Sequence, residues 1–127
     1  MGRWQRFNEN PAGRNVGDCA VRAVALALRV DWETAYEMIC RAGLAMADMP
    51  SSNAVWGAVL RQNGFYRYAV SNTCPDCYTV RDFAEDHPVG TFVVGTGNHV
   101  VTIINGIVYD SWDSRNEIPQ YYWTRKE

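Results

Sequence analysis

The sequence predicts an α+β fold, in which helices come first and a C-terminal antiparallel β-sheet follows. Segments that begin with good helix-capping residues extend to residue 87, and runs rich in valine, isoleucine and aromatic residues follow Pro88. The 127 residues, 47% of them hydrophobic, are enough to bury one core. We therefore expect a single domain over residues 1–127.

The charge balance argues against nucleic acid and membranes as partners. Twelve basic and fourteen acidic side chains give a net charge of −2, whereas nucleic-acid-binding domains usually carry a basic surface. No stretch approaches the roughly 18 consecutive apolar residues of a membrane-spanning helix. The first residues lack the apolar segment of a signal peptide. We therefore expect a cytoplasmic protein with reduced cysteines.

Four helices are expected, over residues 19–29, 31–41, 51–63 and 79–87, with Ser51 or Ser52 as the N-cap of the third. The first follows Asp18, a favourable N-cap residue, and its apolar residues cover nearly every face, which predicts that it is buried. Gly43 and Gly64 are expected just past the ends of the second and third helices. Thr79 and Asp82 have the spacing of a capping box at the start of the fourth.

The expected strands cover residues 91–95, 100–104, 107–112 and 118–123. Asn105-Gly106 separates two β-branched runs, which is the strongest short-range signal for a hairpin. With a two-residue turn, His99 faces Trp112 across the hairpin, and Asp110 is the diagonal neighbour of His99. Strand alternation puts residues 99, 101, 103, 108, 110 and 112 on one face of the sheet, so His99 and Asp110 are expected to share it.

Cys19 has the position of an activated nucleophile. It follows Gly17 and Asp18 at the start of the first expected helix. The unpaired N–H groups and the dipole of a helix N-terminus favour a thiolate, and so does a neighbouring imidazolium. Most lone cysteines are buried structural residues. The position at a helix start, rather than in mid-helix, favours a catalytic role for Cys19.

His99 is the histidine expected to activate this thiol. It precedes an expected strand, and a carboxylate follows on the next strand, which completes the parts of a nucleophilic triad. His87 stands at a helix end, where the helix dipole explains a histidine well. The hairpin register selects Asp110 as the residue that orients His99. Asp113 falls on the opposite face unless a bulge intervenes, and it is the second choice.

These elements, in this order, resemble the papain-like cysteine peptidase superfamily. The likeness is closer to its small bacterial and phage-type members, including the peptidases that cleave leader peptides during bacteriocin export. The matching motifs are Gly-Asp-Cys at 17–19, Gly-Asn-His-Val-Val at 97–101 and Tyr-Asp-Ser-Trp at 109–112. The resemblance implies a papain-like fold and a thiol-dependent attack on an amide or isopeptide carbonyl in a peptide or protein. It does not imply a particular substrate, a cofactor or an oligomeric state.

The sequence departs from the papain-like pattern at the oxyanion donor. Members of the superfamily commonly have a glutamine six residues before the nucleophile, and this chain has Gly13 there. The backbone N–H of Cys19 can donate one hydrogen bond to the oxyanion whatever the side chain. Asn15 is the nearest side-chain amide and the candidate for the second donor. Without a second donor, the alternative is a catalytically weak or inactive domain that binds a protein partner. A further alternative is an acyltransferase that uses the same residues to transfer an acyl group to an amine.

The pair Cys74 and Cys77 forms a single Cys-x-x-Cys motif. A zinc site needs four ligands, and strong zinc motifs carry two such pairs or a histidine pair. A redox role lacks the strand-then-helix context. We therefore expect a turn at this motif, with no metal and no cofactor.

Overall fold

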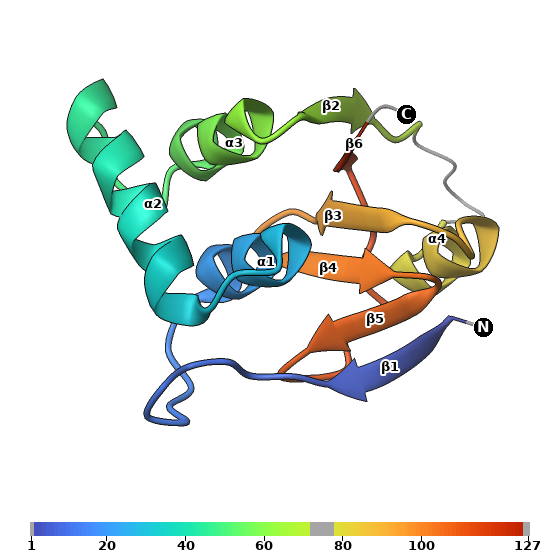
Figure 1. Cartoon of the computed structure of the whole chain (residues 1–127). Coiled ribbons are helices and arrows are strands. Elements are labelled where there is room, and N and C mark those ends of the chain that lie inside the picture. Colours follow the sequence, from blue (N-terminus) through green and yellow to red (C-terminus); the bar gives the residue numbers. More distant parts are fainter. Residues whose placement is uncertain (1, 72–77, 126–127) are drawn as a thin grey trace.

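The structure, a computed structural model that describes residues 2–71 and 78–125, contains four helices and one mixed β-sheet of six strands in that part of the chain. The helices are α1 (Cys19–Leu28), α2 (Trp32–Met46), α3 (Asn53–Gln62) and α4 (Val80–Asp86). The strands are β1 (Arg3–Arg6), β2 (Phe65–Ala69), β3 (Thr91–Gly95), β4 (Val100–Ile104), β5 (Ile107–Asp110) and β6 (Tyr121–Arg125). The α+β class is confirmed (Figure 1).

The helices cover the two faces of the sheet unequally. On one face α1 crosses β4 and α3 packs against β2 and β6, and α2 packs on the outside of both helices (Figure 1). The hydroxyl of Thr102 donates to the carbonyl of Ala23 at 2.7 Å and ties β4 to the middle of α1. On the other face, α4 packs on Val101, Ile103 and Val108. The burial expected of α1 is confirmed, because this helix lies between the sheet and α2, with α3 beside it.

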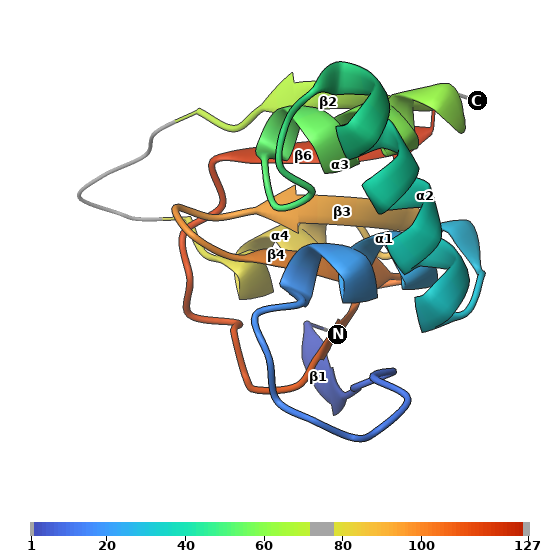
Figure 2. The same ribbon diagram turned by 90° about the vertical axis from the view of Figure 1, so that its left-hand side faces the viewer.

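The C-terminal strands β3 to β6 pair antiparallel, as expected, but the sheet as a whole is mixed. The strand order is β1-β5-β4-β3-β6-β2, and β1 pairs with β5 in parallel. Neither β1 nor β2 was expected, because both lie at sheet edges and leave most of their side chains exposed. Such strands lack the apolar alternation by which a strand is recognised in sequence. The segment between β1 and α1 leaves the sheet as a loop and returns to the start of α1 (Figure 2).

Other boundaries also differ from those expected, and strand β5 ends at Asp110 rather than at residue 112. Helix α2 continues past Gly43 and ends at Met46, with Ala47 in the left-handed conformation at φ 55°. Gly43 is needed inside the helix because a Cβ there would lie 2.9 Å from the carbonyl oxygen of Asp48. The last strand begins at Tyr121 rather than at residue 118. The N-cap at Ser52 and the capping box of Thr79 are present as expected.

The hairpin between β4 and β5 has the expected register. Asn105 and Gly106 have φ values of 50° and 77°, as a two-residue turn with both central residues at positive φ requires. Ile104 pairs with Ile107, and the ladder continues to Thr102 and Tyr109. His99 therefore lies before the first residue of β4, and Asp110 is the last residue of β5, at one end of the sheet.

Candidate active site

The start of α1 leaves backbone donors free around Cys19. Asp18 occupies the N-cap position with φ −110° and ψ 23°, and its side chain makes no capping hydrogen bond. Among the described residues, no acceptor pairs with the backbone N–H groups of Cys19, Ala20 or Val21. Free N–H groups at a helix N-terminus favour negative charge. A thiolate, or an oxyanion formed next to it, would be stabilised here.

The carboxylate of Asp18 is engaged elsewhere. Its Oδ1 accepts from Nε of Arg22 at 3.0 Å, and its Oδ2 accepts from the indole N–H of Trp32 at 2.9 Å. Arg22 is itself buried, and its Nη1 donates to Oδ1 of Asp110 at 2.9 Å. A buried guanidinium needs anionic partners to offset the loss of hydration. Arg22 thus links the carboxylate at the start of α1 to the carboxylate at the end of β5.

The carboxylate of Asp110 is fully buried and accepts four hydrogen bonds. Its Oδ2 lies 2.6 Å from Nε2 of His99 and accepts from the hydroxyl of Ser114 at 2.7 Å. Its Oδ1 accepts from Arg22 and from the backbone N–H of Ser111 at 2.7 Å. Burial alone would raise the pKa of Asp110, but the hydrogen bonds from His99, Ser114 and Arg22 outweigh it and lower that pKa. Asp110 is therefore an anion that holds the His99 ring in one orientation.

Cys19 and His99 each shift the pKa of the other. Burial raises the pKa of the Cys19 thiol. Hydrogen bonding to the His99 side chain and to the backbone N–H of Val100 lowers the pKa by more, so the net pKa is below the ordinary value. Burial lowers the pKa of His99, but the hydrogen bonds and charges of Asp110 and Cys19 raise it to about 9. With Nε2 on Asp110, Nδ1 is the ring nitrogen left for the thiol. At neutral pH these shifts favour a thiolate beside an imidazolium.

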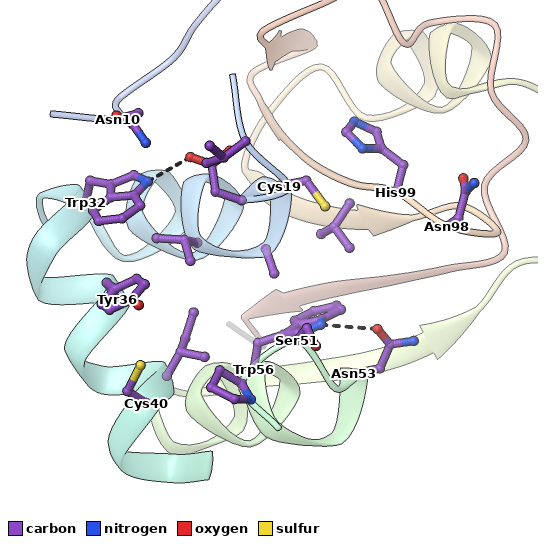
Figure 3. A pocket seen from close by; sticks show the side chains of 18 of the residues that line it. Asn10, Cys19, Trp32, Tyr36, Cys40, Ser51, Asn53, Trp56, Asn98 and His99 are labelled. Carbon is purple, nitrogen blue, oxygen red and sulfur yellow. Dashed lines mark hydrogen bonds between the residues drawn. The ribbon is translucent and has the colours of Figure 1, made fainter. Parts of the chain in front are cut away.

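The Cys19 sulfur opens into a cleft with two arms. The apolar arm, about 620 Å³, passes between α1, α2 and α3; it is lined by Ala20, Val21, Trp32, Tyr36, Cys40 and Trp56, among others. The polar arm, about 500 Å³, passes between the β1–α1 loop and the end of β5; it is lined by Arg6, Asn8, Asn15, Ser111 and Trp112, among others. Cys19, Asn98 and His99 line both arms. Figure 3 shows the Cys19 sulfur pointing into the cleft between His99 and Trp56.

Asn15 lies in the wall of the polar arm, together with Cys19. Its side chain is exposed and accepts or donates no hydrogen bond within the described residues, so its amide is available to a bound group. Gly13 is also exposed, and a side chain there would meet no atom within 4 Å. Asn98, which lies at the junction of the two arms, is a second free amide that the sequence did not single out (Figure 3).

The remaining candidates lie apart from the thiol or outside the described residues. Asp113 binds Arg115 through both carboxylate oxygens at 2.8 Å, so Asp110 and not Asp113 contacts His99. The Nδ1 of His87 is 2.8 Å from the carbonyl of Phe83, in the cluster under α4. Cys74 and Cys77 fall outside the described residues.

The described residues offer neither a metal-binding cluster nor a membrane-spanning helix. They contain no group of three or more histidine, cysteine, aspartate or glutamate side chains that could hold a metal ion. No helix in residues 2–71 and 78–125 has the length and apolar composition needed to cross a membrane.

His99 and Asp110 contact each other on the α1 side of the sheet and not on the face predicted from strand alternation. Val101, Ile103 and Val108 face the α4 side, as alternation requires. His99 and Asp110 lie beyond the last ladder pair, and their side chains reach Cys19 and Arg22 of α1 instead. The predicted partner is present, but the predicted common face with residues 101, 103 and 108 is wrong.

Sequence reasoning missed Arg22, and it missed that the carboxylate of Asp18 binds Arg22 and Trp32 instead of capping α1. The available signal was the charge itself, because Arg22 interrupts the otherwise apolar run from Ala20 to Leu28. A charged residue inside a buried helix requires a buried partner. The partner Asp110 could not be identified from spacing alone, since it is 88 positions away.

Comparison with known proteins gave no matching family model, no matching curated protein and no matching solved structure. The functional conclusion therefore rests on the geometry and electrostatics of the cleft.

Proposed function

We propose that this chain is a cysteine hydrolase that cleaves a peptide or isopeptide bond through a Cys19–His99–Asp110 triad. The observation that carries the proposal is the short hydrogen bond from His99 to Asp110, at 2.6 Å, on a histidine that also lowers the pKa of an open-cleft thiol. A cysteine kept only for packing needs neither an imidazole nor a buried carboxylate behind it. The papain-like order of helix, imidazole strand and carboxylate strand, and a cytoplasmic location, belong to the same proposal.

The reaction begins from the thiolate–imidazolium pair. The Cys19 sulfur attacks the carbonyl carbon, an S–C bond forms, and the carbonyl oxygen becomes an oxyanion. The backbone N–H of Cys19 and the amide of Asn15 donate to that oxygen. The His99 imidazolium transfers its proton to the amide nitrogen as the C–N bond breaks, which leaves a thioester and a free amine.

Water then completes the cycle. Neutral His99 removes a proton from water, and the resulting hydroxide attacks the thioester carbonyl. The C–S bond breaks, the thiolate departs, and the imidazolium is restored beside it. Asp110 stays ionised throughout, because its contacts with Arg22 and Ser114 hold it as an anion.

Alkylation of the folded protein tests this proposal, with Cys40 as an internal control. Cys40 is also a partly buried free thiol and lines the same cleft, but it is not in the triad. With one equivalent of iodoacetamide at neutral pH, peptide mapping should find the label on Cys19 and little on Cys40. His99→Ala should abolish this preference. Equal labelling of the two cysteines, or none, would instead favour the domain that only binds a partner.

A further inference from the structure

A second groove, of about 370 Å³, adjoins the apolar arm of the cleft. It is lined mainly by residues of α3, β2 and β6, and it shares Asn53, Trp56 and Tyr121 with the apolar arm. Gly57 lets the Trp123 ring lie against α3, because a Cβ on Gly57 would be 2.9 Å from that ring. Since the two cavities share a wall, a chain bound in the cleft can extend past Tyr121 into this groove.

Two arginines lie over aromatic rings in the lining of this groove. The guanidinium carbon of Arg61 is 5.1 Å from the centre of the Trp123 ring, and that of Arg67 is 4.3 Å from the centre of the Tyr121 ring. Arg67 pairs with Trp123 in the ladder of β2 and β6, so Tyr121 is its diagonal neighbour. A guanidinium over a ring keeps the N–H groups at its edge available for other partners. We call this cavity the basic groove.

The basic groove offers hydrogen-bond donors that lack acceptors. Among the residues that the structure describes, neither Arg61 nor Arg67 has a hydrogen-bond acceptor or an ion-pair partner. The indole N–H of Trp123 is buried and has no acceptor there either. Asn53 accepts through Oδ1 from the indole N–H of Trp56 at 3.2 Å, which leaves its NH₂ group unpaired (Figure 3). A set of donors without acceptors fits an anionic group supplied from outside.

The free charges along the cleft and the basic groove have one sign. Asp18 is the acidic residue in the lining of both arms, and Arg22 and Trp32 occupy its two carboxylate oxygens. No acidic side chain among the described residues lines the basic groove. The exposed charged residues that line the three cavities are Arg6, Arg14, Arg61 and Arg67. The chain as a whole has a net charge of −2, so this concentration of positive charge is local and favours an acidic ligand.

We infer that the basic groove binds an acidic side chain of a peptide substrate, whose carboxylate contacts Arg61 and Arg67 while another part of the same peptide reaches Cys19. This inference rests on the proposed function and adds an acidic peptide as the substrate class. Carboxylates and guanidinium groups match each other as paired hydrogen-bond partners. Arg61 and Arg67 are then specificity-determining residues, because neither lines the arms that hold the reacting thiol.

Two series of peptide electrophiles test the inference. Acetyl-tetrapeptide vinyl sulfones place the peptide on one side of the reacting carbon, and chloroacetyl-tetrapeptide amides place it on the other. One residue at a time is glutamate or its uncharged isostere glutamine, the others are alanine, and mass spectrometry follows the modification of Cys19. At one position or more, glutamate should react about fivefold faster than glutamine, the upper range for an exposed ion pair. Added salt should reduce this ratio. A ratio near one at every position of both series would overturn the inference.

Arg67→Gln and Arg125→Gln provide a matched pair of variants. Both residues are exposed arginines over an aromatic ring, Tyr121 for Arg67 and Phe65 for Arg125, but Arg125 lines neither the arms nor the basic groove. Each substitution removes one positive charge from the surface, so both variants should fold. Arg67→Gln should lower the glutamate-to-glutamine ratio severalfold, and Arg125→Gln should leave it unchanged. A ratio that survives Arg67→Gln combined with Arg61→Gln would contradict the assignment of the groove.

Iodoacetamide separates this inference from the function on which it depends, because it carries no side chain for the groove to select. If iodoacetamide labels Cys19 selectively but glutamate and glutamine peptides react equally, the acidic substrate class is wrong and the nucleophile stands. If Cys19 reacts with neither iodoacetamide nor the peptide electrophiles, the proposed hydrolase and its substrate class both fail.

Discussion

Helices α1 and α2 both begin directly after an aspartate, and the two aspartates behave differently. Asp31 has φ −75° and ψ 168°, and its Oδ1 accepts from the backbone N–H of Thr34 at 2.8 Å. Asp18 instead turns its carboxylate toward Arg22 and Trp32 and leaves the first N–H groups of α1 without an acceptor. The N-cap side chain of α2 therefore binds one of the first N–H groups of that helix, whereas the N-cap side chain of α1 binds none.

The same residue type thus caps one helix and leaves the start of the other uncapped. An uncapped helix start gives up favourable hydrogen bonds. Those free donors surround Cys19, where negative charge develops in the proposed reaction. Trp32, the first residue of α2, also supplies one of the bonds that hold Asp18 away from α1. The start of one helix thus helps to keep the other uncapped.

The largest loss of stability is expected from a substitution of Asp110, the second carboxylate that binds Arg22. Asp110→Asn leaves the buried Arg22 and His99 without their shared anion, and breaking a buried ion pair costs about 3–5 kcal/mol. The urea midpoint should fall accordingly, and Cys19 alkylation at neutral pH should slow. Asp113→Asn is the control, because Asp113 binds the more exposed Arg115, and its urea midpoint should stay near that of the wild type.

The pH dependence of that difference follows from the direction of the shift. The pKa of Asp110 is lowered by folding, so its contribution is present above the unfolded carboxyl pKa of about 3.9 and is lost as the pH falls through the folded value. His99 has a raised pKa, so its contribution is full below about 6.5 and is lost as the pH rises through about 9. Wild type and Asp110→Asn should thus differ most in urea stability between about pH 5 and 6.5. A difference that persists unchanged at strongly acidic pH would contradict this assignment.

The same substitution at the two helix starts should have a smaller but clearly unequal effect. Asp18→Asn removes one anion from the buried Arg22, and a hydrogen bond to a charged group is worth about 2 kcal/mol. Asp31→Asn should leave the urea midpoint almost unchanged, because asparagine caps helices as well as aspartate does. Equal losses for the two variants would mean that Asp18 acts as an ordinary cap.

The smallest effect is expected for Asp31→Ala. This change removes the side-chain acceptor for Thr34 at the exposed start of α2, so the urea midpoint should drop slightly. The rate of Cys19 alkylation should not change, since Asp31 contributes to neither the pKa of Cys19 nor that of His99. A large loss of thiol reactivity in this variant would break the distinction between the two helix starts.

Local sequence chemistry predicted the elements that carry their own signals. The Asn105-Gly106 turn fixed the hairpin register and identified Asp110 as the partner of His99, although the two side chains meet on the α1 side of the sheet and not on the predicted face. The capping box at Thr79 and the cap at Ser52 marked two helix starts correctly. These features depend on residues that lie within a few positions of one another.

The missed features depend on contacts made across the fold. Strand β1 exists because Arg3–Arg6 pairs with β5, about a hundred residues later in the sequence, and nothing in its own pattern requires it. Asp18 has the composition of a cap, but Arg22, held by Asp110, draws its carboxylate away. Propensity rules describe a helix start in isolation, and here a tertiary ion pair overrides them.

The most direct test of the account is the pH titration of the Cys19 thiol by ultraviolet thiolate absorbance, taken as the difference between wild type and Cys19→Ser. The wild type should show a thiolate that forms below the ordinary cysteine pKa of about 8.5, and His99→Ala should return the titration to that value or above it. A wild-type titration at or above about 8.5 that does not respond to His99→Ala would contradict the claim that His99 activates Cys19.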